Sequence, residues 1–188
     1  MIGWVTAGAA AVALVIVVVM RFGGPGPQPA PAARPTGPAA APDISQMTPR
    51  ERADRLFDRI VDAAERGDTA EITRFHPMAV AAYDLLDERD ADARYHIGVI
   101  HTLMGNPAGA RAQLDSLRGA EPSHLLGTML DYAIARIERD AVAEQRTYLR
   151  FIETYDAEIA KPQPEYEAHE AAIDAFLAAA RRALSESN

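Results

Sequence analysis

Five histidines are the residues of this sequence best suited to bind a metal ion or to move a proton: His76, His96, His101, His124 and His169. None has the His-Glu-x-x-His spacing of zinc peptidases, because His169-Glu170 is followed by Ala-Ala-Ile. His96 and His101 are separated by five positions, which places them on different faces of a helix. We therefore expect no metal ligand among them. His101 is expected to pack between helices, and His124 to lie at a solvated helix start.

Other reactive side chains show no catalytic pattern. The serines Ser116, Ser123 and Ser185 lack the Gly-x-Ser-x-Gly context of a nucleophile elbow. Carboxylates such as Asp84, Asp87, Glu88, Asp90 and Asp92 cluster at predicted helix ends, where a solvated surface explains them. The sequence has no cysteine, which excludes disulfides, thiolate zinc sites and thiol nucleophiles. We expect no enzymatic activity, no catalytic residue, no cofactor and no bound metal.

Charge is distributed unevenly along the chain. All 27 acidic residues lie at or after Asp43, whereas two of the 19 basic ones, Arg21 and Arg34, precede it. The part from residue 43 onward is therefore more acidic than the whole chain, whose net charge is −8. An acidic domain argues against nucleic acid as a partner and against direct adhesion to anionic lipid.

Residues 1–22 are predicted to form a transmembrane anchor. The run from Ile2 to Met20 carries no charge, and as a helix it spans about 28 Å, close to the hydrocarbon thickness of a bilayer. A cleaved signal peptide is the alternative, but no Lys or Arg precedes the run and no small-x-small site follows it. Small residues at four-residue spacing suggest contact with a partner transmembrane helix, unless they only reflect an Ala-rich composition. These residues are Gly3, Ala7 and Ala11.

Residues 23–44 are predicted to be an extended linker between the anchor and a helical domain over residues 45–188. The linker carries seven prolines among Gly and Ala, which favours polyproline II and a reach of roughly 60 Å. Arg21 alone beside the anchor favours a cytoplasmic domain, whereas a Pro/Ala tether behind a single anchor is common in bacterial envelope proteins. We expect a single-pass protein of the bacterial inner membrane with a periplasmic domain.

Helix signals dominate after the linker. Thr48-Pro49-Arg50-Glu51 forms a capping box with proline at the first helical position, and the apolar period that follows ends at Gly67. A second helix is predicted from Asp68, interrupted at Pro77, with a further helical stretch from Met78 to Leu86. The pattern predicts an all-α domain.

One segment has a readable repeat pattern between residues 90 and 122. Ile97-Gly98 is followed by the turn Gly105-Asn106-Pro107, then by Ala110 and Leu114 at four-residue spacing, and Pro122 closes the unit. This arrangement resembles the tetratricopeptide repeat (TPR) family, although Arg94 and His101 stand where that family often has Trp and Tyr. Small residues at Gly98 and Ala110 would permit close helix crossing.

Weaker units flank this segment. Ala133 and Leu149 follow Gly98 and Leu114 by 35 residues, near the family period, with Asp140 at the turn. Upstream, a degenerate unit with an insertion near Pro77 extends the resemblance over residues 50–158. The last helix is predicted to cap the array, or alternatively to bind a partner. Its apolar face comprises Tyr166, Ile173, Phe176, Leu177, Ala180 and Leu184.

The resemblance implies a concave face that binds proteins or peptides. The candidate partner-binding residues come from the first helices of each pair, where ordinary exposed helix residues are the alternative: Arg94, Tyr95, His101, Thr102, Thr128, Asp131 and Tyr132. We expect a non-catalytic, membrane-anchored interaction module, serving as an accessory subunit of a multi-subunit membrane complex such as a respiratory or photosynthetic assembly. The alternative is a TPR-type assembly or chaperone factor for membrane or envelope proteins. The expected partners are other membrane-complex subunits, including a transmembrane helix.

Overall fold

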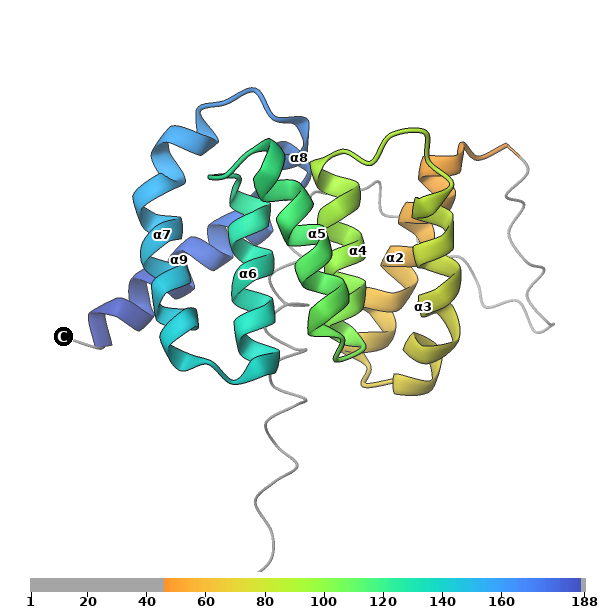
Figure 1. Ribbon diagram of the computed structural model, residues 1–188, viewed down its shortest axis with the longest axis horizontal. Helices are drawn as coiled ribbons and strands as arrows, with labels where there is room; N and C mark the ends of the chain where they lie inside the picture. Colours follow the sequence, from red (N-terminus) through yellow and green to blue (C-terminus); the bar gives the residue numbers. More distant parts are fainter. Residues whose placement is uncertain (1–45, 187–188) are drawn as a thin grey trace, which may run out of the picture.

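The computed structural model describes residues 46–186, and this part of the chain is all-helical, with no strand (Figure 1). The helices are α2 (Pro49–Glu65), α3 (Thr69–Asp84), α4 (Ala91–Leu103), α5 (Pro107–Ala120), α6 (Leu125–Glu138), α7 (Ala141–Ile159), α8 (Pro164–Ala168) and α9 (Glu170–Glu186). None of these helices is both long and apolar enough to cross a membrane. The predicted anchor, the linker and the small residues Gly3, Ala7 and Ala11 lie outside the described residues.

Successive helices pair as antiparallel hairpins, and local sequence signals set their ends. The predicted capping box is confirmed, because the Thr48 side chain accepts from the Glu51 backbone while the Glu51 carboxylate accepts from the Thr48 backbone. The side chains of Asp90 and Asn106 cap α4 and α5 by accepting hydrogen bonds from the backbone N–H groups of Ala93 and Gly109. Gly105 has a positive φ of 64° in the turn between them, a conformation that favours glycine. The α2–α3, α4–α5 and α6–α7 hairpins follow from these signals (Figure 1).

The predicted interruption at Pro77 is wrong, because α3 continues through it from Thr69 to Asp84. Proline removes one helical hydrogen bond, but the buried side chains on both sides of Pro77 lie on one face and pack against α2. Tertiary packing of Phe75, Ala79 and Tyr83 therefore holds the helix together across the proline.

The predicted close approach at Gly98 is confirmed. A Cβ atom at this position would lie 2.8 Å from Leu130 Cδ1, so the glycine lets α4 and α6 pack against each other. The predicted register of the second unit is wrong, because Leu149 is 46% exposed. The buried residues of α7 include Glu158 and, on either side of Leu149, Thr147 and Phe151. These two lie 37 residues after Ala110 and Leu114, so this unit is longer than the family period suggested.

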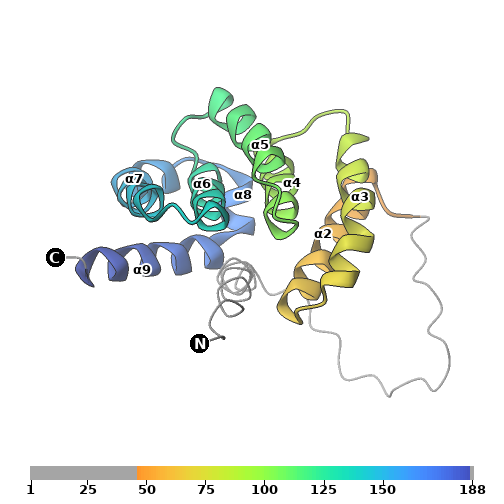
Figure 2. The same ribbon diagram turned by 60° about the horizontal axis from the view of Figure 1, so that its bottom comes forward.

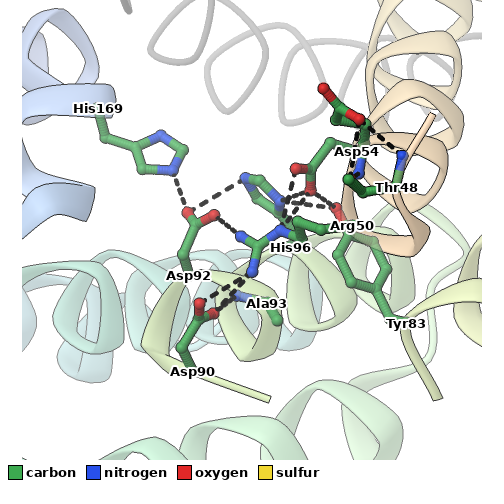
Figure 3. A network of polar contacts seen from close by, with 10 residues as sticks. Thr48, Arg50, Asp54, Tyr83, Asp90, Asp92, Ala93, His96 and His169 are labelled. Carbon is green, nitrogen blue, oxygen red and sulfur yellow. Dashed lines mark hydrogen bonds and ion pairs between the residues drawn. The ribbon is translucent and has the colours of Figure 1, made fainter. Parts of the chain in front are cut away.

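The C-terminal helix α9 packs mainly on α7 and also contacts α6. Figure 2 shows it crossing beneath both helices. Its buried residues include Ile173, Phe176 and Leu177, as expected for a helix that covers the last hairpin. The predicted single terminal helix is divided at His169 into α8 and α9. The division turns the imidazole of His169 towards α4 (Figure 3).

Candidate functional site

The candidate partner-binding residues are less accessible than a concave TPR face implies. Tyr95, Thr102, Thr128 and Tyr132 are buried, with at most 7% of their surface exposed. Arg94, His101 and Asp131 are half-buried, and Asp131 forms an ion pair with Arg118. Partner binding through these residues stays a prediction.

The C-terminal part of the chain covers the two tyrosines among these residues. Phe176 of α9 lies edge-on to Tyr132 with ring centroids 5.1 Å apart, and His169 lies edge-on to Tyr95 at 5.3 Å. Both aromatic residues of the predicted face therefore contact the chain's own C-terminal part. A groove formed by α4 and α6 is closed at these positions.

The same arrangement brings together three potential ligands that the sequence places far apart: Asp92 and His96 of α4, and His169 at the α8–α9 junction (Figure 3). One ligand atom from each lies within 4.8 Å of the others. The His169 Nε2 atom is 2.6 Å from Asp92 Oδ1, and the His96 Nε2 atom is 3.4 Å from the same oxygen. Among residues 46–186, this set is the one arrangement that could hold a metal ion.

His96 is held in place on its other side. Its ring stacks on Phe57 of α2 with centroids 3.8 Å apart, and its Nδ1 atom lies 2.8 Å from the hydroxyl oxygen of Tyr83. That hydroxyl donates its proton to Asp54 Oδ1 at 2.7 Å, because a carboxylate can only accept. His96 Nδ1 must then carry a proton and donate it to the tyrosine oxygen. In the neutral ring, Nε2 is consequently a bare acceptor, and it is buried with no hydrogen-bond partner.

Arg50 of α2 joins three carboxylates around this cluster. Its guanidinium bonds Asp54 at 3.0 Å and Asp90 at 2.9 Å, and it also binds Asp92 Oδ2. Burial raises the pKa of Asp92, but the hydrogen bond from His169 and the charges of His96, His169 and Arg50 outweigh it and lower that pKa to about 2. Asp92 is therefore a carboxylate at neutral pH. The three carboxylates outnumber the one guanidinium, so the local charge is negative.

A pocket of about 700 Å³ opens beside Asp92. Carboxylates dominate its polar lining, which comprises Arg50, Asp54, Asp90, Asp92, Glu121, Gln163 and Glu165. His124 does not lie in a solvated position as predicted. It is the N-cap residue of α6, 1% exposed, with Nε2 3.1 Å from Glu165 Oε1, because α8 packs over this helix start.

A second histidine pair links α3 to α4. His76 Nε2 lies 3.4 Å from His101 Nδ1, and both rings are half-buried, which confirms that His101 packs between helices. Burial lowers the pKa of His76, and burial together with the charge of His76 lowers the pKa of His101. Both imidazoles therefore favour their neutral forms.

An open groove runs along the outer surface of the α2–α3 hairpin and encloses about 1070 Å³. Its apolar lining residues include Leu56, Met78, Ala82 and Leu85. Met78 is 52% exposed and Leu85 is 80% exposed. Its basic lining residues are Arg52, Arg55, Arg59 and Arg66. Arg59 and Arg66 pair with Glu71, whereas Arg52 and Arg55 have no ion pair within residues 46–186.

Two features of these sites escaped sequence reasoning. The four-residue spacing of Asp92 and His96 places both on one helix face and is a readable signal for a shared ligand. The contribution of His169, 77 residues away, has no local signal. The sequence matches no protein-family model, no curated protein and no solved structure, so the likeness to TPR proteins stays a resemblance.

Proposed function

We propose that this protein is a non-catalytic, membrane-anchored interaction module whose docking surface is the α2–α3 groove. The observation that carries the proposal is the exposure of Met78 and Leu85 in a groove that arginines also line. Large apolar side chains that stay exposed together, framed by charged residues, are typical of protein-binding surfaces. This surface replaces the α4–α6 face that the repeat pattern suggested.

The proposed occupant is an acidic amphipathic helix of another membrane-complex subunit. An apolar helix face would cover Leu56, Met78 and Leu85, while its carboxylates would pair with Arg52 and Arg55. Acidic residues Asp58 and Asp62 also line the groove, and this mixture of charges suits a patterned protein segment better than a uniformly anionic lipid surface. An accessory subunit of a membrane complex fits this role, and a TPR-type assembly factor is the alternative.

Site-specific photo-crosslinking tests the proposal. A photoreactive residue at position 85 of the full-length chain should yield one main crosslinked protein in native membranes, and position 142 on α7 is the matched control because Val142 is 74% exposed. The crosslinked segment, made as a synthetic peptide, should carry net negative charge and bind the full-length protein. The double substitution Arg52→Glu/Arg55→Glu should weaken that binding by at least about tenfold.

Two outcomes would reject the groove as a protein-docking site. Equal crosslinking at positions 85 and 142 would show that the surface has no specific partner. Crosslinking from position 85 to phospholipid rather than to protein would identify a lipid contact instead. Stoichiometric recovery of the partner in mild detergent separates a stable subunit from a transient assembly factor.

A further inference from the structure

We propose that Asp92, His96 and His169 form a binding site for a first-row divalent transition-metal ion, with Zn²⁺ as the reference ion. The site joins α4 to the α8–α9 junction and does not depend on the proposed groove. Two imidazole nitrogens and one carboxylate oxygen are a donor set that suits Zn²⁺ and its neighbours, whereas Ca²⁺ and Mg²⁺ prefer oxygen ligands.

The unpaired Nε2 atom of His96 is the first observation that points to a ligand. The side chain of His96 is 9% exposed, and its bond to the tyrosine hydroxyl fixes the proton on Nδ1. The bare Nε2 faces Asp92 Oδ1 at 3.4 Å. A lone pair that faces a carboxylate in a buried position is unfavourable unless a cation or a proton lies between them. A metal ion at this point satisfies both atoms.

The three ligand atoms lie within 4.8 Å of one another, so one ion can reach all of them after shifts of the side chains. Zinc bonds of about 2.0–2.2 Å place neighbouring ligand atoms about 3.3 Å apart in a tetrahedron. The separation between His96 Nε2 and Asp92 Oδ1 is already 3.4 Å. The 2.6 Å contact between His169 Nε2 and Asp92 Oδ1 has to open by several tenths of an ångström. That opening accompanies loss of the proton that the two atoms share, because a metal-bound imidazole nitrogen carries none.

The surroundings supply the outer contacts and the charge that such a site needs. Tyr83 orients the imidazole of His96 through Nδ1, and Arg50 holds the second oxygen of Asp92. Asp54 and Asp90 also bind Arg50, so the guanidinium does not leave an excess of positive charge. The acidic pocket beside Asp92 gives a cation a path from solvent and space for water as a fourth ligand.

Metal titration of the full-length chain tests the site. The protein is purified in mild detergent without a histidine tag, dialysed against a chelator, and titrated with Co²⁺ as the spectroscopic probe and then with Zn²⁺. We expect one ion per chain, with release of protons on binding, and a rise in the melting temperature at saturating Zn²⁺. His96→Gln and His169→Gln should each weaken binding by at least about tenfold.

The second histidine pair provides the matched control. His76→Gln/His101→Gln removes two half-buried imidazoles 3.4 Å apart and should leave metal stoichiometry and affinity unchanged. Absence of binding to the wild-type chain, or equal binding by His96→Gln/His169→Gln, would overturn the proposal. If these two variants lose the helical circular dichroism of the wild type, pulsed electron paramagnetic resonance of the Cu²⁺-loaded wild type decides. The Cu²⁺-loaded His76→Gln/His101→Gln variant is measured beside it, so that the second pair cannot supply the ligands. Two coordinated imidazoles in that variant support the site, and fewer than two reject it.

Discussion

Two histidine pairs cross helix interfaces in this domain, and they differ in the groups that surround the rings. His96 and His169 share the carboxylate of Asp92, and Tyr83, Asp54 and Arg50 extend that network to α2 and α3. His76 and His101 contact each other, and within residues 46–186 no carboxylate lies within hydrogen-bonding distance of either ring. The first pair lies in a negative environment suited to a cation, and the second is suited to neutral rings. The carboxylate, rather than the proximity of two imidazoles, therefore determines whether a histidine pair is suited to bind a cation.

The largest expected loss of stability comes from removing the Asp92 carboxylate, which lies between His96 and His169. Asp92→Ala should lower the free energy of unfolding by about 3 kcal/mol, because it leaves His169 and Arg50 without the carboxylate that both bind. The Asp92 side chain is 16% exposed, so solvent screens this loss only weakly. Asp84→Ala, whose side chain is 53% exposed, is the control and should cost about 0.5 kcal/mol or less. Equal urea denaturation midpoints for the two variants would contradict the comparison.

A pair of double-mutant cycles measures the difference between the two histidine pairs directly. The cycle of Asp92→Asn with His169→Gln should give a coupling energy of about 2 kcal/mol, since the two side chains share a short bond at 2.6 Å. The cycle of His76→Gln with His101→Gln should give less than about 0.5 kcal/mol. The measurement is urea unfolding of the four variants of each cycle, and similar coupling in both would remove the distinction.

A smaller loss of stability is expected when the Tyr83 hydroxyl, which links His96 to Asp54 of α2, is removed. Tyr83→Phe keeps the buried ring but removes the bonds to Asp54 and His96, and should cost about 1 kcal/mol. Tyr155→Phe removes a single exposed bond to Asp174 at 3.1 Å and is the matched control. Thermal unfolding of both variants should show the larger decrease for Tyr83→Phe, and the reverse order would show that the network contributes nothing there.

The smallest expected effect is a pH dependence of the stability that His76 and His101 contribute. Burial lowers the pKa values of His76 and His101 in the folded state, so the unfolded chain binds protons more readily in the window below the ordinary histidine pKa of about 6.5. Stability from this pair therefore increases as pH rises through that window and decreases on acidification. Asp84 opposes the shift at His101.

His76→Gln/His101→Gln should reduce the fall in melting temperature between about pH 7 and about pH 5. The variant's melting temperature is measured against the wild type at each pH, so that titration of other groups cancels. A steeper fall in the variant would show that the pair is stabilised by protonation instead.

Local signals allowed much of the helical framework to be predicted. The capping box at Thr48, the turn at Gly105 and the small residue at Gly98 each lie where the sequence indicated. These features depend on neighbours within a few residues or on steric size, which the sequence displays directly.

Features that depend on tertiary packing were not predicted. Pro77 does not interrupt α3, because the face formed by Phe75, Ala79 and Tyr83 packs on α2. Leu149 lies on the exposed side of α7, since that unit is longer than the family period. The candidate site could be predicted only in part. Asp92 and His96 have a recognisable spacing in the sequence. His169 joins them because the C-terminal helical segment is interrupted between α8 and α9.

The break at His169 also has a consequence for the order in which the domain matures during synthesis. Arg50, Asp54, Asp92 and His96 leave the ribosome well before His169, which follows Asp92 by 77 residues. The first hairpins can form earlier because their contacts are local, but the polar cluster between them stays without its last member until the chain is nearly complete. The bond between His169 and Asp92 can therefore form only after almost the whole domain has been synthesised. A truncated chain that ends at Ile159 would lack this bond.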